Sequence, residues 1–231
     1  MTQDPFYTTL PARGRIVLSG PDRAAFLQDL VTQDIRLLTP DALLYSCLLT
    51  PQGKFLHDFF ILAPDADTIL LDCEGGTRTQ DLFKRLTLYR LRKRVELTCG
   101  EDAPVYGVFG EALGWPDPRH PEMGFRSYEK PQTLPESPFC VWDHWRITLG
   151  IPDGSRDLVI GQSTLDEGRI EALHGVSYDK GCYVGQELTA RMHYRGLGKK
   201  HLQRVPLSAL PAGAELRSTC GDIGLALVKA V

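Results

Sequence analysis

The chain has 231 residues, of which 42% are hydrophobic and 24% are charged, and its formal net charge at pH 7 is −3. This length allows one large domain or two to three small ones, and the composition is that of an ordinary globular protein. A nearly balanced charge gives no overall attraction to nucleic acid or to an anionic membrane. No apolar run approaches the ~18 residues needed to span a bilayer, so we expect neither kind of partner.

The N-terminal residues 1–5 (MTQDP) show no basic region followed by an apolar one and no arginine-rich amphipathic helix. We therefore expect a cytoplasmic protein, and a bacterial one if the chain is full length. The six cysteines are dispersed and include no CxxC pair, which predicts reduced thiols rather than a disulfide framework. The histidines show no HxH or HExxH spacing, so no resident metal is predicted.

The first hundred residues alternate strand and helix patterns. Strands are predicted over 14–18, 43–50, 55–62, 68–72 and 95–98. One helix is predicted after Asp22, and a second from Thr77 or Thr79, where Leu82, Leu86 and Tyr89 share one helical face. Residues 51–54 (PQGK) form a turn between two of the strands. This order predicts an α+β fold with helices on one face of a mostly antiparallel sheet.

The rest of the chain divides into two further parts. Residues 101–197 are expected to form a second α+β portion after the body at 1–100, with strands at 105–109 and 123–128 and helices over 142–149 and 165–174. Residues 198–231 carry short strand patterns at 201–207, 214–218 and 223–230. They predict a shortened C-terminal β-barrel-like segment.

The most unusual stretch is residues 180–187 (KGCYVGQE), which combines a cysteine, two glycines and charged ends. Gly181 and Gly185 permit backbone angles that a side chain would block. Two interpretations stand: a turn that lines a ligand pocket with Cys182 as a reactive or redox thiol, or a tight turn beside a buried and inert cysteine. Lys180 would favour the Cys182 thiolate if both side chains lay on one side.

Two further groups are candidates for chemistry. Asp58 follows His57 on a predicted strand, so the two side chains point to opposite faces and a shared site is not expected. A basic run from Arg191 to Arg204 offers cations for carboxylates, but it has too few interleaved aromatics for a nucleic-acid surface. For Lys199 and Lys200 we favour a solvated strand face.

Several motifs together resemble the YgfZ family, folate-binding proteins related to the aminomethyltransferase (T-protein) of the glycine cleavage system. The KGCYVGQE string is that family's signature, and the resemblance extends over most of the chain. Further matching segments are RITLGIP (146–152), LHGVSYD (173–179), GPD (20–22), TQD (32–34) and PQGK (51–54).

The resemblance implies a T-protein-like fold with a central pocket that binds tetrahydrofolate. It implies an accessory protein, without independent turnover, that supports iron–sulfur cluster assembly or repair in client enzymes. Cys182 would be its reactive thiol. The folate-binding candidates carried over are Lys180, Gly181, Tyr183, Gly185, Gln186, Glu187 and Arg191.

The chain also departs from the T-protein pattern. His57 and Asp58 stand where T-proteins carry a pair of aspartates, so at best one acid of the pair is kept, and Asp58 or His57 could still handle a proton. Arg191 is expected to neutralise a buried carboxylate, with Glu187 the candidate. The alternative function is a folate-dependent one-carbon enzyme that resembles an aminomethyltransferase or demethylase, and a third possibility is an adaptor whose pocket is vestigial.

Overall fold

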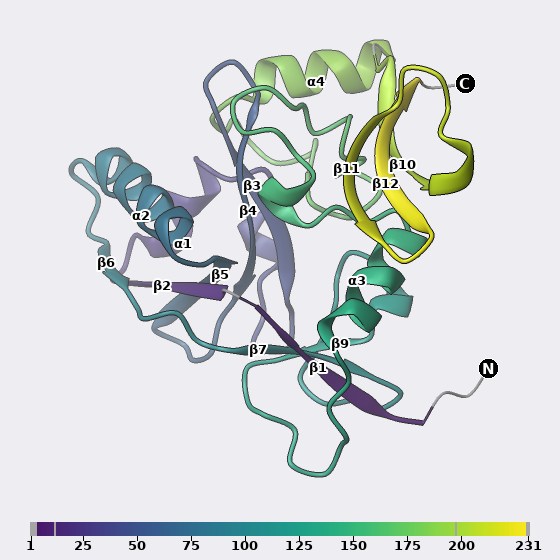
Figure 1. Ribbon diagram of the computed structural model, residues 1–231. Coiled ribbons are helices and arrows are strands. Elements are labelled where there is room, and N and C mark those ends of the chain that lie inside the picture. The colour runs from purple at the N-terminus through teal and green to yellow at the C-terminus, as the bar shows by residue number, and fades with distance from the viewer. Residues whose placement is uncertain (1–3, 12, 197, 230–231) are drawn as a thin grey trace.

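The protein folds around three antiparallel sheets and four α-helices in the computed structural model, which describes residues 4–11, 13–196 and 198–229 (Figure 1). The five-stranded sheet and two helices lie on one side, and a C-terminal sheet lies on the other. Four single-turn 3₁₀ helices lie in the connections: Ile35–Leu37, Pro121–Met123, Gly154–Arg156 and Leu207–Ala209. Within the described residues, no helix is both long and apolar enough to cross a membrane.

The largest sheet has the strand order β3-β4-β5-β2-β6 and is antiparallel throughout. Its strands are β2 (Arg13–Ser19), β3 (Leu44–Leu49), β4 (Phe55–Leu62), β5 (Thr68–Glu74) and β6 (Glu96–Cys99). Helices α1 (Arg23–Gln28) and α2 (Thr77–Arg90) cover one face, where Phe26, Leu27, Leu82 and Leu86 share an apolar cluster with the strands. The predicted α+β sheet with helices on one face is confirmed.

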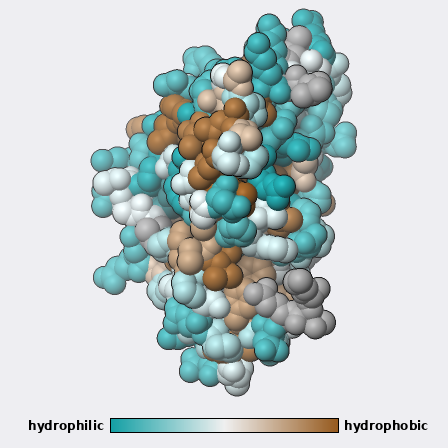
Figure 2. Space-filling view, turned by 45° about the vertical axis from the view of Figure 1, so that its right-hand side comes forward, coloured by the Kyte–Doolittle hydropathy of each residue, from teal (hydrophilic) through white to brown (hydrophobic). Residues whose placement is uncertain are grey.

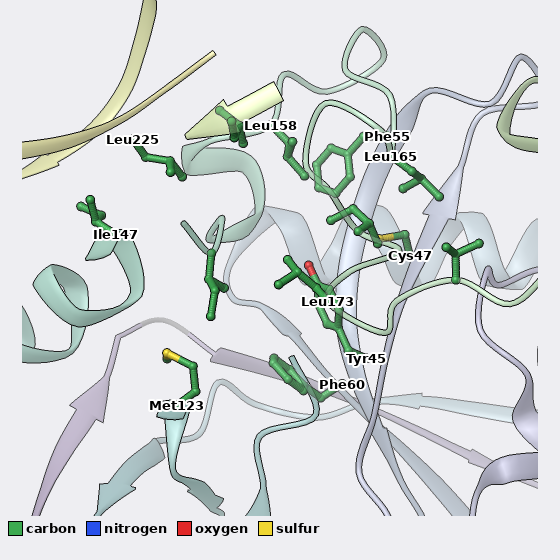
Figure 3. Close-up of a cluster of buried hydrophobic side chains, with 14 of the residues drawn as sticks. Tyr45, Cys47, Phe55, Phe60, Met123, Ile147, Leu158, Leu165, Leu173 and Leu225 are labelled. Carbon is green, nitrogen blue, oxygen red and sulfur yellow. The ribbon is translucent and has the colours of Figure 1, made fainter. Parts of the chain in front are cut away.

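The other face of this sheet packs on a central core that joins distant parts of the chain. Figure 3 shows Tyr45 and Phe60 from the sheet, Leu165 and Leu173 from a loop, and Leu225 from the C-terminal sheet around one apolar interior. These side chains are almost fully buried. Because the five-stranded sheet, the loop and the C-terminal sheet share one core, that core sets their positions relative to one another.

A second sheet, with the order β1-β7-β9-β8, links the N-terminus to the middle of the chain. Its strands are β1 (Phe6–Leu10), β7 (Val105–Phe109), β8 (Trp115–Pro116) and β9 (Phe125–Ser127). Strand β1 was not predicted, and it pairs with β7 across almost a hundred residues. The three-part division at residues 100 and 197 stays a prediction.

The C-terminal strands form a small open sheet beside α3 (Phe139–Thr148). Strands β10 (Lys200–Pro206), β12 (Ile223–Lys229) and β11 (Glu215–Cys220) pair in that order. Over the described residues up to 229 this sheet does not close into a barrel. Three strands are too few to curl round and pair their own edges, so the segment is a sheet and the barrel expectation is corrected.

Two local predictions differ from the structure. The helix expected over 165–174 is wrong: the segment is a series of turns, because Arg169 and His174 adopt left-handed backbone angles, φ +51° and +56°, that end a helix. Helix α4 (Gln186–Arg195) was missed. Its signals are in the sequence: Gly185 before it, Glu187 in the first turn, and Gly196 directly after it in a left-handed conformation.

Candidate functional site

The KGCYVGQE motif forms a loop that leads into α4, and a contact between two glycines fixes it. Gly185 has φ +82°, and a Cβ there would lie 2.5 Å from Thr50 O and 3.0 Å from Gly53 Cα. Gly53, in the PQGK turn, has φ +74° and would meet Gly185 O at 2.8 Å. Two motifs separated by about 130 residues therefore pack backbone against backbone, and neither position has room for a side chain.

Lys180 anchors the start of the loop. Its side chain is buried, and Nζ donates hydrogen bonds to Val31 O at 2.6 Å and Gln33 O at 2.8 Å. Nζ also lies 5.2 Å from the centre of the Tyr183 ring, a favourable cation–π distance. Burial lowers the pKa of Lys180 to about 8, an effect that Asp34 partly opposes. The ammonium is thus bound to the 31–33 segment and not directed at a surface thiol.

Cys182 lies at the exposed tip of the loop. The space around the neighbouring Gly181 is open, because a Cβ there would have no atom of the described residues within 4 Å apart from those of its two chain neighbours. Of the two interpretations made from the sequence, the one with a buried cysteine is therefore wrong, and the reactive role of Cys182 stays a prediction. The described residues contain no group of three or more His, Cys, Asp or Glu side chains placed to hold a metal ion, so Cys182 presents one thiol alone.

The remaining motif residues have separate surroundings. Arg191 donates to Glu187 Oε1 at 2.6 Å, one turn apart on α4. The Glu187 side chain is 85% exposed, so the expected buried carboxylate is instead a surface one. Gln186 is the first residue of α4, and its backbone N–H donates a hydrogen bond to Tyr183 O. Tyr183 is buried, and its hydroxyl makes no hydrogen bond with the described residues.

Asp58 belongs to a different site, in the centre of the molecule. Its carboxylate accepts a hydrogen bond from the Tyr45 hydroxyl at 2.8 Å and is almost fully buried. Burial, reinforced by Glu74, raises the pKa of Asp58 to about 6. Its neighbour His57 faces α2 instead and pairs with Asp81 at 2.8 Å. The prediction that these two side chains point to opposite faces is confirmed.

The cavity at Asp58 is charged, aromatic and very small. Arg13 and Arg126 both pair with Asp72 at 2.7 Å, and the Arg126 guanidinium lies 3.8 Å from the centre of the Phe60 ring. The full lining is Leu10, Pro11, Arg13, Asp58, Phe60, Arg119, Arg126, Phe139, Trp142 and Asp153. Its volume of about 30 Å³ is enough for about one water molecule.

The groups that line this cavity therefore suit folate, but the cavity is too small to hold it. A buried carboxyl, arginines and aromatic rings suit a polar planar ring with an anionic tail, yet the described cavity does not admit a pterin. None of the motif residues 180–187 lines it. The structure thus places Asp58 in a cavity apart from Cys182 and from the predicted folate-binding residues.

Known proteins resemble this chain in sequence and in fold. No family model matches it. The human iron–sulfur cluster assembly factor IBA57 is 31% identical over 95% of this chain and 76% of its own length. The homologue of that factor in Mycosarcoma maydis is 30% identical over 93% of this chain and 60% of its own length. The chain belongs to the IBA57 family.

The fold has a solved counterpart outside that family. The glycine cleavage system aminomethyltransferase T from Bartonella henselae superposes with a TM-score of 0.72 over 97% of this chain and 78% of that one, at 14% identity. At this identity the likeness shows the fold alone. The predicted relationship to YgfZ-type proteins and to the T-protein fold is confirmed.

The comparisons also correct the predicted location. The human and fungal IBA57 proteins are named as mitochondrial, so the cytoplasmic location expected from the sequence is wrong by this finding. Residues 1–5 are too few to carry such an inference. A bacterial origin stays a prediction.

Proposed function

We propose that this protein is an iron–sulfur cluster assembly factor in which Cys182 is the functional thiol. The proposal is supported by membership of the IBA57 family, whose human member is named for this role. The observation that carries it is the exposed Cys182 on a loop braced at both ends, by Lys180 on one side and Gly185 on the other. A braced loop holds a surface thiol in one position without covering it.

One thiol defines what the site can do. Iron–sulfur clusters are held by several cysteine thiolates, and the ligand is the deprotonated form. Cys182 can supply one such thiolate, and a partner protein that carries a cluster would supply the others. The open space at Gly181 leaves room for that partner to approach. The protein then acts as an accessory to cluster transfer rather than as a resident cluster carrier.

The test compares two exposed cysteines. Cells that lack their own IBA57 protein receive this chain, its Cys182→Ala variant or its Cys99→Ala variant, and the activity of [4Fe–4S] enzymes is measured at matched protein levels. Cys99 is also exposed but lies on β6, outside the motif. We expect Cys99→Ala to restore activity like the intact chain and Cys182→Ala to restore less than a tenth of it. Equal restoration by both variants would refute the role of Cys182.

Tetrahydrofolate is the second part of the proposal and rests on the family resemblance and on the groups around Asp58. Because the cavity holds about 30 Å³, binding requires the residues that line it to move apart. When bound, tetrahydrofolate would supply one-carbon chemistry. From this chain, Asp58 would hold a proton at the ring, and Arg119 and Arg126 would bind its anionic groups.

Calorimetric titration with tetrahydrofolate tests this part separately. We expect saturable binding by the intact protein, no loss of affinity in Cys182→Ala, and at least tenfold weaker binding in Asp58→Asn. The same loss in a surface control such as Asp179→Asn would show that the effect is not specific to the cavity. Absence of any binding by the intact protein would remove folate from the function and leave the Cys182 proposal standing.

A further inference from the structure

A second pair of thiols lies where α3 meets the C-terminal sheet. Cys140 is the second residue of α3, and Cys220 is the last residue of β11. Figure 1 shows the turn between β11 and β12 beside α3. Both cysteines line one open groove of about 950 Å³, whose apolar wall includes Phe6, Phe109, Val141 and Trp145. Figure 2 shows patches of apolar surface among hydrophilic ones on the side of the molecule that its rotation brings forward.

The two cysteines are already in contact. The Cys220 thiol donates a hydrogen bond to Cys140 O at 3.3 Å, across 80 residues of sequence. Two further observations place the same elements together. Arg146 Nη2 on α3 donates a hydrogen bond to Ser218 Oγ on β11 at 2.8 Å. Gly221 lies beside His144 of α3, because a Cβ built on this glycine would be 3.8 Å from His144 Nδ1. Cys140 and Cys220 therefore lie on two elements that are held against each other at this groove.

The two thiols differ in access. Cys140 is exposed, and it lies in the first turn of α3, where unpaired backbone N–H groups favour a negative charge. Cys220 is half-buried, and burial together with Asp143 raises its pKa. Cys140 is thus the thiol that a solute meets first, and Cys220 is the neighbour that can react second. Oxidation-sensitive cysteines commonly have such a resolving partner.

We propose that Cys140 and Cys220 form a thiol–disulfide exchange site that small-molecule disulfides oxidise reversibly. The Cys140 thiolate attacks one sulfur of the disulfide, forms a mixed disulfide and releases one thiolate. The Cys220 thiolate then attacks the Cys140 sulfur, forms the Cys140–Cys220 bond and releases the second thiolate. The protein loses two electrons and two protons, and the small disulfide is reduced to two thiols.

This inference goes beyond the proposed function, because it uses neither Cys182 nor the Asp58 cavity. The new bond would tie α3 to the C-terminal sheet and close a loop of 80 residues. A closed loop of that length restricts the unfolded chain strongly. The oxidised protein should therefore unfold at a higher temperature than the reduced protein.

The experiment uses glutathione disulfide as the probe and the full chain as the target. Unreacted thiols are alkylated after a timed incubation, and the protein is digested without reductant for mass spectrometry. We expect a cross-linked peptide that joins Cys140 to Cys220, and its loss when a reductant is added. Cys220→Ser should stop at a Cys140–glutathione adduct at least tenfold more abundant than in the intact chain. Cys140→Ser should give no cross-link.

Controls separate this result from general thiol oxidation. Cys99→Ser and Cys182→Ser should both form the cross-link at the rate of the intact chain, and circular dichroism checks that each variant is folded. The proposal is overturned if the intact chain accumulates the Cys140 adduct as strongly as Cys220→Ser does. It is equally overturned if glutathione reacts only at Cys99 or Cys182, or if oxidation leaves the unfolding temperature of the cross-linked protein unchanged.

Discussion

At the scale of single residues, His57 and Asp58 show how a strand places two neighbours in opposite electrostatic settings. Asp58 lies in the central cavity, where burial raises its pKa to about 6. His57 lies under α2, where burial and the Arg78 charge lower its pKa to about 4. Between pH 4 and pH 6, folding leads Asp58 to take up a proton and His57 to release one. Their contributions to the pH dependence of stability therefore offset each other.

The first prediction separates the two contributions. The pKa of Asp58 is raised on folding, so its stabilising effect is complete below about pH 4 and is lost as pH rises through 6, by about 3 kcal/mol at most. The pKa of His57 is lowered on folding, so stability falls as pH drops from 6.5 through 4. As pH rises, we expect the stability of Asp58→Asn to increase relative to that of the intact chain. Over the same range, we expect the stability of His57→Gln to decrease relative to that of the intact chain.

Urea denaturation of the three proteins at several values between pH 4 and pH 7 measures this. The other titrating groups are common to the three proteins, so the differences report on Asp58 and His57 together with their direct partners. If the free energies of unfolding of both variants run parallel to that of the intact chain across this range, the assigned surroundings of Asp58 and His57 are wrong.

At the scale of elements, the position of α4 depends on Gly185. Gly181, four residues earlier in the same motif, contributes little. A Cβ at residue 185 would require a strained backbone, φ +82°, and would lie 2.5 Å from Thr50 O. We expect Gly185→Ala to lower the free energy of unfolding by about 2 kcal/mol or more, since both strain and a backbone clash oppose it. Gly181→Ala meets open space and should change it by less than about 0.5 kcal/mol.

The two variants carry the same Gly→Ala change four residues apart in one motif, so they are matched in composition. Urea denaturation gives both values, and protease sensitivity at α4 reports whether the helix has detached from the 50–53 turn. A Gly185→Ala protein as stable as the Gly181→Ala protein would mean that the two motifs do not pack as described.

At the scale of the whole molecule, one buried arginine joins α3, the loop after it and the C-terminal sheet. Arg146 is fully buried and bonds Asp143 at 2.7 Å, Ser218 at 2.8 Å and the carboxylate of Asp157. Ser218 also donates to Asp157, so the group is closed on itself. The C-terminal sheet is thus attached through charge as well as through the shared apolar core.

The third prediction concerns this attachment. Arg146→Leu would leave Asp157 buried without its cation, and we expect a loss of about 3–5 kcal/mol in the free energy of unfolding. Arg191→Leu removes an exposed pair on α4 and should cost less than about 1 kcal/mol. Chemical denaturation compares the two, and a loss at Arg146 no larger than at Arg191 would show that the buried group does not hold the sheet.

The sequence by itself determined most of the strands, α1, α2 and α3, because their signals are local: alternating or 3.6-residue apolar spacing, and turns such as PQGK at 51–54. It also indicated Cys182 and the family. Helix α4 carries equally local signals, and its omission was an error of interpretation. The helix expected over 165–174 failed because Arg169 and His174 adopt left-handed angles, which their residue types do not predict.

Only the tertiary structure decided how these elements serve function. The contact of Gly185 with Gly53, the burial of Lys180 on the 31–33 segment, and the exposure of Cys182 all depend on which distant segments become neighbours. The separation of Asp58 from the motif and the contact of Cys140 with Cys220 also depend on which distant segments become neighbours. Local preference acts over a few residues, whereas one shared core sets the relative positions of segments more than a hundred residues apart.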